Sequence, residues 1–136
     1  MHQFEGHGSF NIDVSGTILS ASLSGSWNMQ MANAFASAFK SEAQPLVGKP
    51  WGHLVLLDDW DLSGPEIQPV IEELVTWCIE QGLVRAAHVY SESMLKKYYL
   101  NKLVLEEMGD FHRHSFRDQQ SAIAWLSAEG FELSAD

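Results

Sequence analysis

A short, nearly unbroken apolar run at residues 53–57 stands directly before the clearest helical pattern in the chain. The run has the length of a strand, and its continuity predicts burial on both faces, as in a parallel sheet. In the pattern that follows, apolar residues recur at intervals of three and four, and Gly82 stands where the helix should stop. These apolar residues are Ile67, Val70, Ile71, Leu74, Val75, Cys78 and Ile79. A buried strand followed by an amphipathic helix is typical of α/β proteins.

The segment before this unit predicts a hairpin and a helix. Residues 9–14 and 17–24 alternate between polar and apolar side chains, and Ser15-Gly16 between them is a turn signal, so we expect a hairpin with one solvated face. From residue 27 to about 43 the period changes to that of a helix, which Ser26 or Asn28 could cap.

The segment after this unit continues the alternation. Residues 85–90 predict a second buried strand, residues 92–108 a helix, and residues 112–116 a short strand. Asp118 is placed to cap a last helix that carries Ala122, Trp125 and Leu126. The predicted order is ββαβαβαβα. It indicates a single α/β domain over residues 1–136, with a mostly parallel sheet and an N-terminal antiparallel hairpin.

Composition narrows the class of protein. The chain is 46% hydrophobic and 19% charged, which is typical of a globular domain. Its net charge of -10 disfavours binding to nucleic acid or to anionic lipid. The single cysteine, Cys78, excludes an intramolecular disulfide framework, and no apolar stretch has the length of a membrane span or the form of an export signal. We therefore expect a cytoplasmic protein.

Two local sequences resemble a known family. Phe116-Arg117-Asp118, followed by Ala122-Ile123-Ala124-Trp125-Leu126, is similar to the C-terminal signature of SpoIIAA-like proteins in the STAS superfamily of anti-sigma-factor antagonists. The apolar run ending at Asp58, followed by Asp61-Leu62-Ser63-Gly64, is similar to the strand, loop and helix start of those antagonists. The resemblance covers nearly the whole chain and implies a STAS-like fold.

The resemblance makes Ser63 a regulatory candidate. In the phosphorylatable members the loop reads Asp-Ser-Ser-Gly, and a partner kinase modifies the second serine. Here Leu62 replaces the first serine and Pro65 follows the glycine, a departure that weakens the expectation of kinase recognition. Ser63 and Glu66 also have the spacing of a helix-capping box, which explains the serine without phosphorylation and is the favoured interpretation.

The same loop supplies an interaction candidate, made of Asp59, Trp60, Asp61 and Glu66. It follows a buried strand, at the edge where ligands commonly bind in open α/β sheets. Its carboxylates could hold a hard cation, although a solvated acidic loop is the simpler interpretation. A tryptophan among acids either tucks under the sheet edge or presents a contact surface, and the sequence leaves both alternatives open.

The first long helix supplies a ligand-pocket candidate. Trp27, Met31 and Phe35, with Met29 and Phe39, form a stripe of large and adaptable side chains. A stripe of this kind is normally core, but it could also wall a pocket for a small hydrophobic, lipid-like ligand or pack on a second copy in a homodimer.

No residue pattern nominates a catalytic group, a metal site or a cofactor. Cys78 falls on the apolar face of a helix, as an inert core thiol does. His53 and His88 lie in apolar strands, where hydrogen-bonded structural histidines are expected, and His112 and His114 share one side of a strand without a further ligand. We therefore expect a non-enzymatic binding or regulatory module that meets a protein partner. The alternatives are a carrier of a hydrophobic ligand and a phospho-switched antagonist that uses Ser63.

Overall fold

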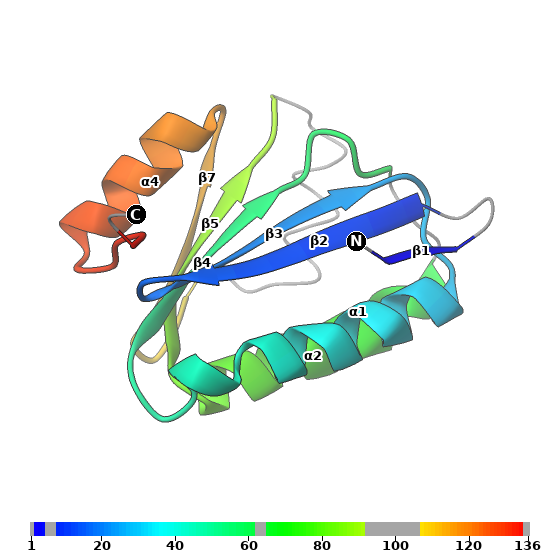
Figure 1. The fold of residues 1–136 in the computed structure, drawn as a ribbon, viewed down its shortest axis with the longest axis horizontal. Helices are drawn as coiled ribbons and strands as arrows, with labels where there is room; N and C mark the ends of the chain where they lie inside the picture. The colour runs from blue at the N-terminus through cyan, green and yellow to red at the C-terminus, as the bar shows by residue number, and fades with distance from the viewer. Residues whose placement is uncertain (1, 5–7, 62–64, 92–106, 135–136) are drawn as a thin grey trace.

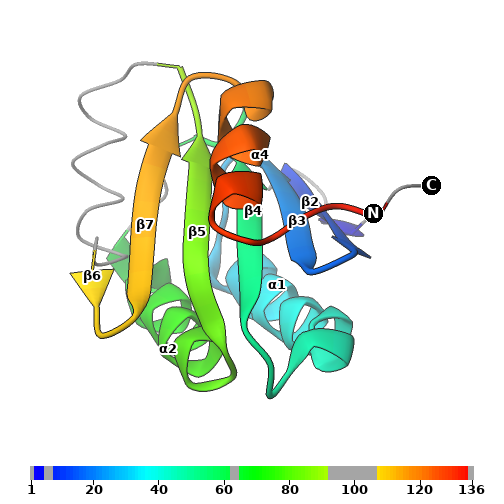
Figure 2. The same cartoon turned by 90° about the vertical axis from the view of Figure 1, so that its left-hand side faces the viewer.

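The strands form one twisted sheet in the computed structural model, which describes residues 2–4, 8–61, 65–91 and 107–134. Within these residues the strand order is β1-β2-β3-β4-β5-β7-β6, and Figure 2 shows this order from β6 across to β2. The strands are β1 (His2–Phe4), β2 (Gly8–Ser15), β3 (Ile18–Ser24), β4 (Trp51–Leu56), β5 (Leu83–Val89), β6 (Glu107–Met108) and β7 (Phe111–Phe116).

The centre of the sheet is parallel and its edges are antiparallel. β3, β4, β5 and β7 pair in parallel, whereas β2 joins β3 as the predicted antiparallel hairpin. The predicted α/β class and the parallel sheet with its N-terminal hairpin are therefore confirmed. The short strands β1 and β6 add an antiparallel neighbour at each edge, which the sequence pattern did not predict.

Helices cover both faces of the sheet. α1 (Met29–Glu42) and α2 (Gln68–Glu80) lie side by side on one face, and α4 (Gln119–Ala128) lies on the other (Figure 1). Two of the predicted caps are confirmed: Asn28 Oδ1 accepts from the Met31 amide at 2.8 Å, and Asp118 Oδ1 accepts from the Ser121 amide at 2.7 Å.

Two helix predictions need correction or fall outside the structure. The helix predicted over residues 92–108 lies mostly outside the described residues, and its last two residues belong to β6 instead. Ser63, the predicted cap of α2, also lies outside them. α2 begins after a single 3-10 turn, η2 (Pro65–Ile67), and Ile67 at its N-cap makes no side-chain cap bond.

The C-terminal end of α2 shows why a glycine is needed there. The helix stops at Glu80, and Gly82 follows with φ +112°, a conformation that side-chain-bearing residues rarely adopt. A Cβ at this position would also clash with the carbonyl oxygen of Lys49. Gly82 thus ends the helix and lets the chain turn directly into β5.

The two faces of the sheet have separate hydrophobic cores. The larger core lies between the sheet and the helix pair α1 and α2, and four of its residues form a chain of edge-on and tilted aromatic contacts, Phe10, Trp27, Phe35 and Phe39. The smaller core lies under α4 and consists of Ile18, Leu54, Ala87, Val89, Ala122, Leu126 and Phe131. Among the described residues, the structure contains no helix with the length and apolar character of a membrane span.

Candidate functional site

A partly open cavity of about 90 Å³ lies in the larger core, between the sheet and the two helices. Aliphatic side chains of β3, β4, β5 and α2 form much of its wall. Aromatic and imidazole rings complete the wall, from Phe35, Phe39, His53, Trp60, His88 and Phe111. Within the described residues, the wall is therefore almost entirely apolar, and its two imidazole rings are the exceptions.

His53 is held in one tautomer by the backbone of the neighbouring strand. Its Nδ1 lies 2.8 Å from the carbonyl oxygen of Leu19, and because a carbonyl can only accept, Nδ1 carries the proton. Burial lowers the pKa of His53 to about 4, so the ring is neutral near pH 7. Nε2 of this neutral ring is then a hydrogen-bond acceptor. The prediction that His53 is a hydrogen-bonded structural residue is confirmed.

His88 is 5% exposed, and its Nδ1 has no hydrogen-bond partner in the described part of the chain. Burial lowers the pKa of His88 well below its usual range, and the positive charge of Arg113 and the nearby His53 lower it further. The sequence predicted a hydrogen-bonded structural histidine at this position. That prediction is wrong for Nδ1 of His88.

The pairing of β4 with β5 brings the two histidines together. His53 is opposite Ala86, and Val55 is opposite His88, so the two rings are diagonal neighbours on the same face of the sheet. The only sequence signal for this site is a pair of histidines inside two apolar strand patterns. That signal does not reveal the cavity, which depends on how α1 and α2 pack over the sheet.

The three predicted pocket residues are only partly at the cavity. Phe35 lines it, but Trp27 and Met31 are buried elsewhere in the core and are not part of its wall. The core interpretation of the stripe therefore holds for Trp27, Met31, Phe35 and Phe39, which are at most 5% exposed, while Met29 is 39% exposed. A second copy of the chain could contact only Met29 of this stripe without unpacking the core.

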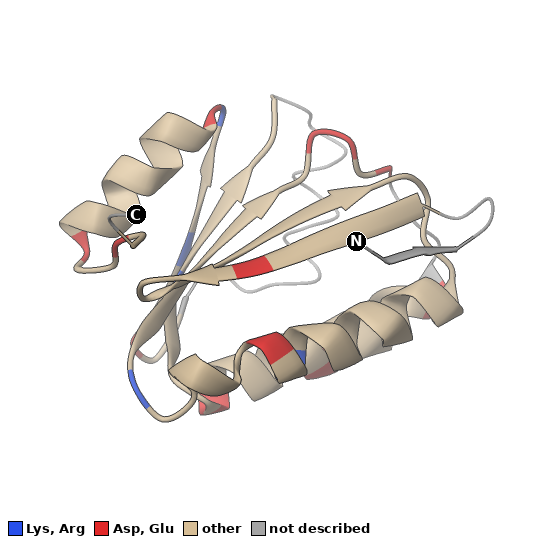
Figure 3. Ribbon diagram, in the orientation of Figure 1, with Lys and Arg blue, Asp and Glu red and all other residues tan. Residues whose placement is uncertain are grey.

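The acidic loop after β4 lies at the carboxyl edge of the sheet. Asp58, Asp59 and Asp61 are exposed there, and Figure 3 shows this loop as a red segment. Asp58 Oδ1 accepts hydrogen bonds from the amide and the hydroxyl of Ser91, at 2.6 and 2.9 Å. The Gly25 amide donates to the carbonyl of Asp59 at 2.9 Å, and the Asp61 amide donates to the carbonyl of Gly25 at 3.1 Å. The loop is thus tied to the ends of β3 and β5.

The structure decides between the two alternatives for Trp60. Its side chain is 3% exposed, lies edge-on to Trp27 with ring centroids 5.6 Å apart, and lines the cavity. Trp60 therefore tucks under the sheet edge and presents no contact surface. Asp59, Asp61 and Glu66 are exposed, so the predicted interaction surface keeps its carboxylates.

An open hollow of about 380 Å³ adjoins this loop on the α4 side of the sheet. Asp58 and Asp59 form one wall, and Arg117, Asp118 and Gln119 form another, at the turn from β7 to α4. Hollows outside the carboxyl ends of parallel strands are common binding places in open α/β sheets. Leu23, Leu56 and Val89 also line the hollow, so its wall is partly apolar.

The other reactive side chains have structural surroundings. Cys78 is 3% exposed, and burial raises the pKa of its thiol, as expected for an inert core cysteine. His114 stacks on Trp125 under α4, with ring centroids 4.7 Å apart. In the described part of the chain, no three His, Cys, Asp or Glu side chains are placed to hold a metal ion together.

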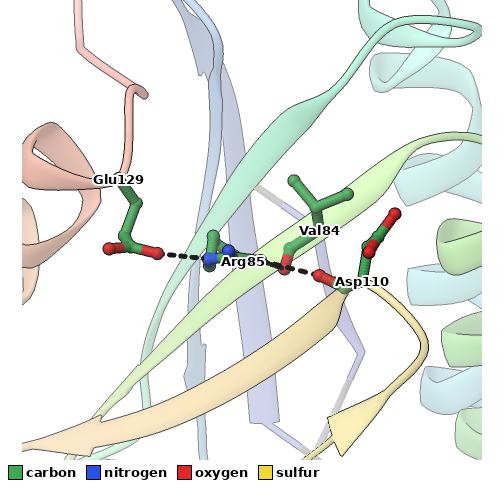
Figure 4. Close-up of polar contacts among 4 residues, drawn as sticks. All are labelled: Val84, Arg85, Asp110 and Glu129. Carbon is green, nitrogen blue, oxygen red and sulfur yellow. Dashed lines mark hydrogen bonds and ion pairs between the residues drawn. The ribbon is translucent and has the colours of Figure 1, made fainter.

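At the opposite, amino edge of the sheet, Arg85 links three segments of the chain (Figure 4). Its Nε donates to the carboxylate of Glu129 at 2.5 Å, and one terminal nitrogen donates to the carbonyls of Val84 and Asp110, each at 2.7 Å. These bonds join the end of α4 to β5 and to the turn before β7. Arg85 therefore has a structural role.

Comparisons with solved structures identify the fold. An uncharacterized protein of the DUF3478 family with a SpoIIAA-like fold, from Shewanella loihica PV-4, aligns with a TM-score of 0.66 at 14% identity, over 93% of this chain and 98% of that one. An anti-sigma factor antagonist from Mycobacterium paratuberculosis aligns with a TM-score of 0.59 at 12% identity, over 93% and 99%. No protein-family model and no curated protein matches the sequence. The chain has the STAS, or SpoIIAA-like, fold.

Proposed function

We propose that this chain is a non-enzymatic binding module that meets a protein partner through the acidic loop between β4 and α2. The observation that carries the proposal is the exposure of Asp59, Asp61 and Glu66, the first two on a backbone segment that is held to the ends of β3 and β5. Fixed, exposed carboxylates complement a basic surface and lose little conformational freedom on binding. The mycobacterial protein of the same fold is an antagonist of an anti-sigma factor, a name that describes an action on another protein.

The charge of the chain supports the same proposal. A net charge of -10 attracts a basic partner over several ångströms and speeds the encounter, while the exposed carboxylates fix the orientation in which the two proteins meet. Ordinary salt screens such contacts, so binding should weaken steadily as salt concentration rises. Phosphorylation of Ser63 stays a prediction, since that residue lies outside the described part of the chain.

A pair of matched variants tests the proposal once a photo-crosslinking residue at position 61 has captured the partner in cells. The variant D59N/D61N/E66Q removes three charges from the loop. We expect it to weaken binding about tenfold, mostly through slower association, because each exposed ion pair contributes about 0.5 kcal/mol. The measurement is association kinetics at two salt concentrations.

The control removes the same number of charges elsewhere. The variant D13N/E42Q/E80Q changes exposed carboxylates of β2, α1 and α2, far along the chain from the loop. Equal weakening by both triple variants would show a nonspecific charge effect and would contradict a contact at the loop. Equal crosslinking from position 61 and from position 73, on the exposed side of α2, would contradict it as well.

A further inference from the structure

Two uncharged imidazoles stand in the wall of a cavity that is otherwise apolar. His53 uses Nδ1 to bind the Leu19 carbonyl, which leaves Nε2 as the acceptor atom of its neutral ring. The Nδ1 atom of His88 is buried and has no hydrogen-bond partner within the described residues. A buried polar group without a partner costs free energy, and a folded protein satisfies nearly all such groups. His88 therefore needs an explanation that the packing of the core does not supply.

The chemistry of the wall defines a matching molecule. A neutral imidazole offers one donor and one acceptor, and a hydroxyl can satisfy either of them. Charged molecules are disfavoured, because the surrounding rings and aliphatic side chains cannot replace their hydration. Aromatic edges from Phe35, Phe39 and Phe111 are suited to an apolar body.

The volume sets the size of that molecule. The cavity of about 90 Å³ is roughly three-fifths of the engineered 150 Å³ cavity that binds benzene, which suggests about four or five non-hydrogen atoms. Pockets for drug-sized ligands measure about 300–1,000 Å³, so the volume of this cavity favours a small molecule over a lipid-like one.

We propose that the cavity between the sheet and the helix pair α1 and α2 binds a small neutral alcohol, whose hydroxyl hydrogen-bonds to the His88 ring. The alcohol's apolar body packs among the aromatic edges, and His53 Nε2 is the second polar group of the same wall. This site is distinct from the proposed protein contact: the loop contributes only the buried Trp60 to the cavity wall, whereas the exposed carboxylates of the loop face solvent.

The test compares two probes of equal size in the full chain, 1-butanol and n-pentane, by NMR of the imidazole nitrogens and the aromatic side chains. We expect 1-butanol to bind saturably, to shift the ring nitrogens of His88, and to show contacts from its methyl group to Phe35 or Phe111. These measurements need no variant and so do not depend on whether a variant folds.

The H88L variant then isolates the hydroxyl contact. Leucine is similar in size to histidine but has no polar atoms in its side chain. Because n-pentane has no hydroxyl, any change in its affinity reports a change in the shape of the cavity. We expect the affinity for 1-butanol, relative to n-pentane, to fall about fivefold or more in H88L, the effect of one lost hydrogen bond. The H114L variant is the matched control, since His114 is on the neighbouring strand β7, stacks on Trp125 under α4 and should leave the ratio unchanged.

Three results would overturn the proposal. The first is the absence of saturable 1-butanol binding in the wild-type chain. The second is an unchanged ratio of affinities in a folded H88L variant. The third is persistent contact between water and the His88 ring at saturating 1-butanol, which would show that the cavity hydrates its histidines and holds no alcohol.

Discussion

The two faces of the sheet are packed in different ways. Under α4, the chain closes tightly around Gly52, where an added Cβ would lie 3.2 Å from Leu126 and 3.3 Å from Phe131. Under α1 and α2, a larger aromatic core leaves a cavity and buries His88. Empty volume and unpartnered polar groups both cost stability. The comparison therefore indicates that the region directly under α4 is closely packed, whereas the core under α1 and α2 keeps costly features that a ligand would explain.

Truncating one leucine on each face gives the largest expected effect. Leu126 is fully buried under α4, and Leu74 of α2 lines the cavity on the other face. We expect L126A to lower the free energy of unfolding by about 4 kcal/mol and L74A by about 2–3 kcal/mol. The cost of L74A is smaller because Leu74 already faces open space and has fewer neighbours to lose. Denaturant unfolding measures both values, and an equal or reversed order would refute the difference in packing.

Acid should destabilise the protein because it protonates the two histidines buried on the cavity face. The pKa of His53 is about 4 in the folded chain and 6.5 in the unfolded chain. Between these pH values the unfolded chain binds a proton that the folded chain does not. The free energy of unfolding therefore has its full value above pH 6.5 and decreases as the pH falls toward 4. The loss is about 3 kcal/mol in all, of which about 2 kcal/mol falls between pH 6.5 and 5, above the range of carboxyl titration. His88, with its lowered pKa, adds to the loss in the same direction.

Unfolding curves recorded between pH 7 and 5 check this expectation. H88L should show a shallower dependence than the wild-type chain, because it removes one of the two buried rings. H114L, on the α4 face, should follow the wild-type curve. A free energy of unfolding that stays constant over this range would mean that neither buried histidine has a lowered pKa in the folded chain.

The elements that the sequence predicted are those with a strong local pattern. The hairpin, the parallel strands and the described helices follow from alternation, from continuous apolar runs and from helical spacing, each of which records which side of an element is buried. β1 and β6 have only three and two residues, too few to show a period, and their pairing depends on strands elsewhere in the chain. Edge strands of this length are fixed by tertiary contacts alone.

The candidate site was less predictable for the same physical reason. The acidic loop could be placed at the carboxyl edge, because that position follows from strand direction. The burial of Trp60 could not, since it depends on Trp27 packing against it from another element. The cavity is a mismatch between helices and sheet, and no pattern along one element encodes the space left between two.

A pair of small-to-larger substitutions compares the two faces most directly, with the smallest expected effects. On the α4 face, G52A should lower the free energy of unfolding by about 1 kcal/mol, because Leu126 and Phe131 must move away from the new methyl group, and the stiffer unfolded chain offsets only part of that cost. On the cavity face, A86V adds two methyl groups to a wall with open space beside it, and valine suits a strand. We expect A86V to be neutral or to stabilise by up to about 1 kcal/mol.

Thermal and denaturant unfolding measure both variants. If A86V costs as much as G52A, the cavity cannot accept two methyl groups, and the contrast between a closed face and an open one fails.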